Sequence, residues 1–248
     1  MACSRRIHAP LLPGSIPGRD CGGNEMLKIH PVPGKKKSED LCRIVADSAP
    51  ASAKGHVFYG VKEGNLAAWR KVLASGEDFY VIDNSYFDRA RGVQYRVTKN
   101  HFQHRGQGHT TGERFAALGY EVKPPREPGF RVLAVEQSPV HMRCVAGDET
   151  WLARRTCGVA QDVRWRRWNA DKLTVQATLQ DDLAWANLVV THSSAAAIEA
   201  LIEGIRVMVA PMSAAYHLTD FSDRLRFFGV LADNQWTLQE IADGAMWK

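Results

Sequence analysis

The segment 188–211 combines side chains that could bind phosphate with the start of a helix. Its sequence is LVVTHSSAAAIEALIEGIRVMVAP. LVVTH predicts a strand, SAAAIEALIEG predicts a helix over 194–204, and IRVMVAP predicts a second strand. The leading N–H groups of such a helix lack intrahelical acceptors and carry the positive end of its dipole, so they attract phosphate. We therefore expect a phosphate site at His192, Ser193 and Ser194.

Glu199 follows these serines by about one helical turn. Ile198, Leu201 and Ile202 recur at the spacing of one helix face and predict a buried stripe. Glu199 lies off that stripe, where its carboxylate could accept two hydrogen bonds from a ribose diol. The alternative, an ordinary exposed helix residue, explains Glu199 equally well.

A strand with basic and aromatic residues precedes this region. In the run DVRWRRWN, residues 162–169, Arg164 and Arg166 share one face of a strand, and Trp165 and Arg167 share the other. An arginine facing a cleft could clamp a diphosphate with two parallel hydrogen bonds. A tryptophan could stack on a base. A basic sheet edge that resists aggregation is the alternative explanation.

The first half of the chain offers a candidate general base. DFYVIDNSYF, residues 78–87, predicts a strand that turns polar at its carboxyl end, where ligands bind in parallel α/β sheets. Asp83 lies there and is our leading candidate base, although a turn-capping aspartate is an equal alternative. His101 and His104 are the other candidates. They fall in 95–112, which we expect to be a mobile loop, and their spacing does not indicate a metal site.

Strands and helices alternate along both halves of the chain. The predicted fold is α/β, with two halves that each contain a parallel sheet. We expect a disordered N-terminal extension over 1–25, with Met26 as a candidate true start, a first α/β domain over 26–125, and a second α/β domain over 126–248. The other predicted strands are 26–33, 56–61 and 130–138, and the other predicted helices are 38–49, 65–77, 146–155 and 178–186.

Composition limits the classes of function. The 248 residues carry a net charge of +5, which favours anionic partners such as nucleotides, glycans bearing phosphate or nucleic acid. No apolar run approaches the ~20 residues of a membrane-spanning helix, so we expect no membrane span. The five cysteines are odd in number and form no C-x-x-C pair, which favours a reducing, cytoplasmic setting without disulfides or structural zinc.

The stretch LQDDLAWANLVVTHSSAAAIEALIEGIRVMVAP resembles the C-terminal nucleotide-sugar half of GT-B glycosyltransferases. The resemblance is greatest to the capsular-polysaccharide synthesis sugar transferases, and the C-terminus resembles that of their uncharacterised, mostly phage-encoded relatives. The resemblance implies two compact Rossmann-like domains whose parallel sheets face a cleft, with 26–125 as the acceptor-side domain and 126–248 as the nucleotide-sugar-binding domain. It also implies a nucleotide-sugar donor as substrate, and no cofactor or metal requirement. The positions that match the family pattern are Ser194, Glu199, Ala200, Gly204 and Val207.

The function expected from this resemblance is transfer of a sugar from a nucleotide-sugar donor to a hydroxyl acceptor. A glycan and a hydroxymethylated DNA base are both open as acceptors. Two alternatives remain. The chain could be a nucleotide-sugar epimerase-like enzyme, or a non-catalytic GT-B-like protein that binds nucleotides or nucleic acid.

Overall fold

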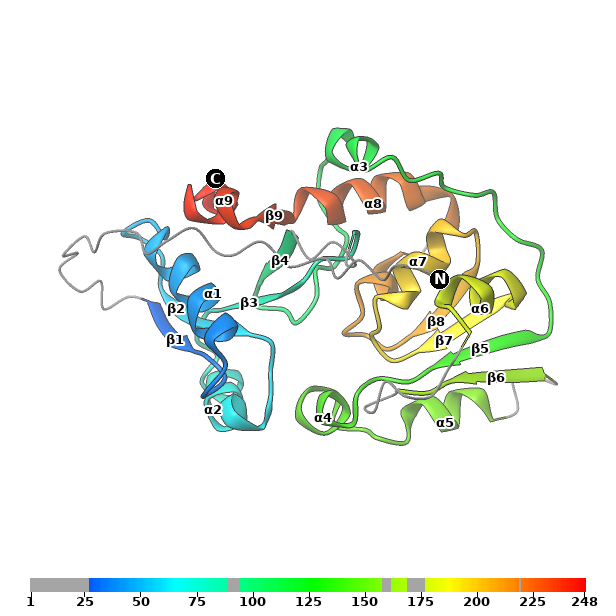
Figure 1. Ribbon diagram of the computed structural model, residues 1–248, viewed down its shortest axis with the longest axis horizontal. Helices are drawn as coiled ribbons and strands as arrows, with labels where there is room; N and C mark the ends of the chain where they lie inside the picture. Colours follow the sequence, from blue (N-terminus) through cyan, green and yellow to red (C-terminus); the bar gives the residue numbers. More distant parts are fainter. Residues whose placement is uncertain (1–26, 89–93, 158–161, 169–176, 219) are drawn as a thin grey trace, which may run out of the picture.

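The computed structural model describes residues 27–88, 94–157, 162–168, 177–218 and 220–248. The predicted extension 1–25 and Met26 lie outside these residues. The fold is α/β, with two sheets that lie side by side and helices packed on them (Figure 1). Within the described part of the chain, no helix is both long and apolar enough to cross a membrane.

The first sheet contains five strands in the order β1-β2-β3-β4-β9. β1, β2 and β3 are parallel, as predicted, whereas β4 is antiparallel to both β3 and β9. This sheet is therefore mixed. Its strands are β1 (Leu27–His30), β2 (Gly55–Tyr59), β3 (Phe79–Asn84), β4 (Gln94–Lys99) and β9 (Gln235–Thr237).

The prediction of a mobile loop over 95–112 was wrong for its first five residues, which belong to β4. We call the first sheet with its helices the first lobe, and the second sheet with its helices the second lobe. Tyr95 and Val97 point into an apolar core of the first lobe. Arg96 and Thr98, on the other face, are polar but buried. Their hydrogen bonds are made within the sheet and its adjoining turn, so burying them leaves few groups unsatisfied.

Helices cover both faces of the first sheet. α1 (Lys36–Asp47) and α9 (Leu238–Ala242) contribute to one core, and α2 (Leu66–Ser75) contributes to the other. α1 begins two residues before the predicted start, and Ser38 is not its N-cap, because the Ser38 hydroxyl instead accepts from the N–H of Val32. α2 ends at Gly76 with φ of 70°, as glycine permits.

The second sheet is fully parallel and has the order β6-β5-β7-β8. One face packs against α6 and α7, and the other against α5 and the turns before it. The predicted helix over 146–155 is shorter than expected. The elements are β5 (Arg131–Val135), α4 (Pro139–His141), α5 (Trp151–Thr156), β6 (Asp162–Arg166), α6 (Leu179–Trp185), β7 (Leu188–Thr191), α7 (Ala196–Ile202) and β8 (Arg206–Val209).

A further apolar core joins the two lobes. Tyr86 and Phe87, which follow β3, pack there with α3 (Glu113–Ala117), α7 and α8 (Arg224–Asp233). α8 runs along the top of the molecule and leads into β9 and α9 on the first lobe (Figure 1). The range 126–248, predicted as one domain, thus contributes its last strand to the first sheet.

Candidate functional site

A cavity of about 170 Å³ opens where three strands from the two sheets end. Its lining includes Asp83 and Asn84 at the end of β3, Glu136 and Gln137 after β5, and the turn 193–195 after β7. All three are carboxyl ends of strands with parallel neighbours, which is where α/β folds bind ligands. The fold therefore brings the predicted Asp83 together with the predicted Ser193 and Ser194. The other lining residues are Arg96, Phe102, Gln103, His141 and Trp168.

The Asp83 carboxylate is held by two hydrogen bonds. Its Oδ2 accepts from Nη2 of Arg96 at 2.5 Å, and its Oδ1 accepts from the N–H of Asn84 at 2.8 Å. Arg96 is only 4% exposed, and its guanidinium lies 4.7 Å from the centre of the Tyr86 ring. These contacts fix Asp83 on the first-lobe side of the cavity.

Three side-chain nitrogens surround the Ser193 hydroxyl. His141 Nε2 lies 2.9 Å from Ser193 Oγ, His192 Nδ1 lies 3.1 Å away, and Gln137 Nε2 lies 3.2 Å away. A hydroxyl has one proton and two lone pairs. With Gln137 donating, one imidazole must donate and the other must accept, so Ser193 is fully occupied by its own protein.

Both imidazoles are neutral at pH 7. Burial lowers the pKa of His141 to about 4, and the neighbouring His192 adds to this effect, while the Asp83 carboxylate opposes it. Burial also lowers the pKa of His192. A neutral imidazole can donate from one nitrogen and accept at the other, as the arrangement around Ser193 requires.

Two donors at the start of α7 are unused. Within the described residues, neither the Ser194 N–H nor the Ala195 N–H donates a hydrogen bond. Both residues line the cavity. The Ser194 hydroxyl accepts from the Ala196 N–H at 3.3 Å, so the anion-attracting groups here are backbone N–H groups rather than the Ser193 hydroxyl.

The alanines of this segment have a packing role. Ala196 contacts the core of the second lobe, and Ala197, with no exposed surface, lies in the core between the lobes. Small side chains let α7 fit between these two cores, and only Ala195 lines the cavity. The buried stripe of Ile198, Leu201 and Ile202 is confirmed.

Glu199 is partly buried, and it does not belong to the lining of the cavity. It lies near Tyr120. Burial raises the pKa of the Tyr120 hydroxyl, and the charges of Asp88 and Glu199 add to this effect. The structure therefore places Glu199 on the side of α7 that faces Tyr120.

A second hollow of about 310 Å³ adjoins the cavity, since both are lined by Glu136 and Gln137. Trp165 on β6 and Arg167, directly after that strand, line one wall of this hollow. Arg167 stacks on the Trp165 ring at 4.8 Å and forms an ion pair with Glu136. A flat indole beside a cation is suited to a planar aromatic ligand.

Arg164 and Arg166 share the opposite face of the strand, as the alternation predicted. Both bind the buried carboxylate of Asp182 on α6, at 3.2 Å and 2.8 Å respectively. Arg164 also lies over the Trp185 ring at 4.2 Å. The two arginines predicted to bind a diphosphate therefore form ion pairs with α6. Neither arginine lines the cavity or the adjoining hollow.

His101 and His104 also lie outside the lining of both hollows. The pKa of His101 is lowered by burial and by Arg105 and His217. Burial lowers the pKa of His104 to about 4, and its Nδ1 accepts from the Gly106 N–H at 3.0 Å. This bond holds the turn at Gly106.

In the described part of the chain, no group of three or more His, Cys, Asp or Glu side chains could hold a metal ion. Cys42, Cys144 and Cys157 are free thiols. Cys3 and Cys21 lie outside the described residues.

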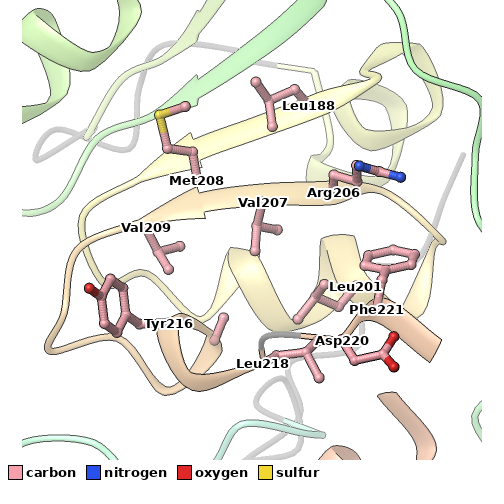
Figure 2. A pocket seen from close by; sticks show the side chains of 11 residues that line it. Leu188, Leu201, Arg206, Val207, Met208, Val209, Tyr216, Leu218, Asp220 and Phe221 are labelled. Carbon is pink, nitrogen blue, oxygen red and sulfur yellow. The ribbon is translucent and has the colours of Figure 1, made fainter. Parts of the chain in front are cut away.

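A larger groove of about 720 Å³ runs along the edge strand β8 (Figure 2). Its side chains are mainly apolar, with Arg206 and Asp220 toward one end and Tyr216 toward the other. The groove lies beside the strand rather than beyond its carboxyl end.

Sequence reasoning missed Arg96, Gln103, Gln137 and His141. Gln137 had a usable signal, because the polar pair Glu136–Gln137 lies at the carboxyl end of the predicted strand 130–138. Arg96 and Gln103 had none, since their segment was expected to be a loop. His141 is placed by α4, a turn too short to predict.

The comparisons with known proteins give a remote likeness to solved structures. No family model matches the chain, and no curated protein matches it. The solved structure of Thermosulfurimonas dismutans KpsC, described as a beta Kdo 2,4 transferase, is similar with a TM-score of 0.42 and 14% identity. The match covers 71% of this chain and 78% of that chain. Function must therefore be argued from the cavity itself.

Proposed function

We propose that this chain is a glycosyltransferase that moves a sugar from a nucleotide-sugar donor to a hydroxyl acceptor. One observation carries the proposal: a carboxylate of the first lobe and two unused N–H groups of the second lobe line the same cavity. Sugar transfer needs a group that accepts the proton of the acceptor hydroxyl and donors that stabilise the departing phosphate.

The second lobe takes the donor. The N–H groups of Ser194 and Ala195 bind its phosphate, because such groups lose no internal hydrogen bond on doing so. The nucleobase enters the adjoining hollow and lies against Trp165, with Arg167 beside it. Glu136 and Gln137 lie where the two hollows meet, so they are placed to contact the sugar or ribose.

The first lobe takes the acceptor. Asp83 accepts the proton of the acceptor hydroxyl, with Arg96 holding the carboxylate in place. Oxygen attack then breaks the bond between the sugar and the phosphate, and the N–H groups stabilise the charge that develops on the leaving phosphate. The acceptor is a glycan or a modified DNA base, and no metal takes part in this scheme.

A thermal-shift screen of the whole chain against nucleotides and nucleotide sugars tests the proposal. Binding of a nucleotide at 100 times its dissociation constant stabilises the fold by about 2.7 kcal/mol. Turnover that survives EDTA supports transfer without metal. Conversion of a nucleotide sugar to its epimer without acceptor would instead indicate an epimerase. DNA binding with steep salt dependence and no nucleotide binding would indicate a nucleic-acid-binding protein.

A further inference from the structure

The side chain of Gln103 forms a clip between the two lobes. It comes from the loop after β4 in the first lobe and is 6% exposed. Its Nε2 donates to the Ser193 carbonyl at 2.6 Å, and its Oε1 accepts from the Ala214 N–H at 2.9 Å. Ser193 follows β7, and Ala214 begins the short 3-10 turn Ala214–His217 after β8. One amide therefore holds two separate turns of the second lobe.

To satisfy both partners at once, a side chain must offer a donor and an acceptor, as the Gln103 amide does at any pH. The Ser193 carbonyl needs a donor, and the Ala214 N–H needs an acceptor. A carboxylate could serve Ala214 but would oppose the Ser193 carbonyl. A thioether of similar length, as in methionine, would leave both backbone groups buried and unpaired, which is costly.

Gln103 holds Ser193, the residue directly before the N–H groups of the proposed phosphate site. The Ser193 hydroxyl is already held by His141, His192 and Gln137. Gln103 supplies the remaining constraint, on the carbonyl, and it alone comes from the first lobe. A displacement of Ser193 would move Ser194 and with it the unused N–H groups.

We infer that Gln103 is a positioning residue, which holds the Ser193–Ser194 turn in the geometry that binds the donor phosphate and ties that geometry to the placement of the first lobe. The inference rests on the proposed function, because that function supplies the phosphate site. The hydrogen bonds that Gln103 makes can be tested even if the chain binds no nucleotide. The charged and titratable groups near this position come from the cavity, the loop of Gln103 and the bonded 3-10 turn. They are Asp83, Arg96, Glu136, His141, His192, His101, His104, Arg105 and His217.

Three variants of the full chain test the inference. Gln103→Met removes both hydrogen bonds, and Gln103→Glu restores them only when its carboxyl group is protonated. Gln107→Met, in the exposed part of the same loop, is the control. The measurements are Tm between pH 5 and 8, the imidazole NMR signals of His141 and His192, and the Kd of a nucleotide identified in the screen.

We expect Gln103→Met to lower Tm by about 4–8 °C, to shift the His141 and His192 signals, and to weaken nucleotide binding by about tenfold. At pH 8, Gln103→Glu should show the same Tm loss, histidine signal shifts and weakened nucleotide binding as Gln103→Met. Its Tm deficit relative to wild type at the same pH should shrink as pH falls, because burial raises the pKa of a carboxyl group. The protonated group then donates to Ser193 and accepts from Ala214.

A deficit of Gln103→Glu that stays constant with pH would overturn the inference. So would a Gln103→Met variant that loses Tm while its histidine signals and nucleotide Kd match wild type, because Gln103 would then serve stability alone. If wild type binds no nucleotide, the proposed function fails, but the Tm and NMR results still decide whether Gln103 positions Ser193.

Discussion

Asp83 and Arg96 are direct cross-strand partners on β3 and β4, and their side chains form a 2.5 Å ion pair at the edge of the inter-lobe cavity. Pairing across an antiparallel ladder fixes both side chains on one face of the sheet. The carboxylate therefore keeps its direction before any ligand binds, as a base acting on a bound hydroxyl requires.

Asp83→Asn tests the base directly. We expect turnover to fall by at least about 100-fold, because the amide cannot accept the acceptor proton, while the Kd for the donor nucleotide stays within about twofold. Asp78→Asn is the matched control, since Asp78 forms an exposed ion pair with Lys99 just before the same strand. Turnover equal to wild type in Asp83→Asn would remove Asp83 from the mechanism.

The variants Arg167→Gln and Arg164→Gln test which side of β6 faces the nucleotide. Arg167 lines the hollow beside Trp165, whereas Arg164 is paired with Asp182 away from it. We expect Arg167→Gln to weaken nucleotide binding by about tenfold and Arg164→Gln to change it little, measured by titration calorimetry. The reverse order would restore Arg164 as the phosphate clamp suggested by the sequence.

Two buried histidines predict acid sensitivity. Burial lowers the pKa of His104 and of His141 from 6.5 to about 4 in the folded chain. Below pH 6.5 the unfolded chain binds protons that the folded chain excludes, so stability is full above that pH and falls as pH drops toward 4. Each group accounts for up to about 3 kcal/mol of this loss.

Urea unfolding of His104→Asn between pH 4 and 7 checks this sign. Asparagine can still accept the hydrogen bond from the Gly106 N–H, so the turn is kept while the titrating group is lost. We expect a flatter profile than wild type. His109→Asn changes an exposed histidine of the same loop and is the control. A profile of His104→Asn as steep as wild type would contradict the assignment.

Gly204→Ala should destabilise the second lobe strongly. Gly204 has φ of +77°, and an added Cβ would lie 2.0 Å from the Pro124 carbonyl oxygen. Gly76→Ala is the control, because Gly76 has φ of +70° and open space around it. Backbone strain alone costs about 1–2 kcal/mol, so we expect Gly204→Ala to cost at least about 2 kcal/mol more. Equal losses of unfolding free energy in the two variants, measured with urea, would show that the segment around Pro124 moves to accommodate the added methyl group.

The local pattern of apolar residues was sufficient to predict much of the fold. The short apolar runs that became β2, β3, β5 and β7 were predictable because buried parallel strands need continuous apolar sequence. The rule that ligands bind beyond strand ends then pointed to Asp83 and to the Ser193–Ser194 turn, since both follow such runs directly. Position relative to a strand end is a local property of the chain.

The rest depends on contacts between residues far apart in sequence. β4 could not be recognised, because its buried polar residues Arg96 and Thr98 have partners on β3, in Asp83 and the Val81 carbonyl. Arg164 and Arg166 share a face, as alternation requires, but Asp182 on α6 decides that they are paired and not free for phosphate. Ser193 was expected in a phosphate site, and tertiary packing instead surrounds its hydroxyl with His141, His192 and Gln137. Sequence periodicity determines which way a side chain points from its own element, whereas only the packing of the two lobes determines what it meets there.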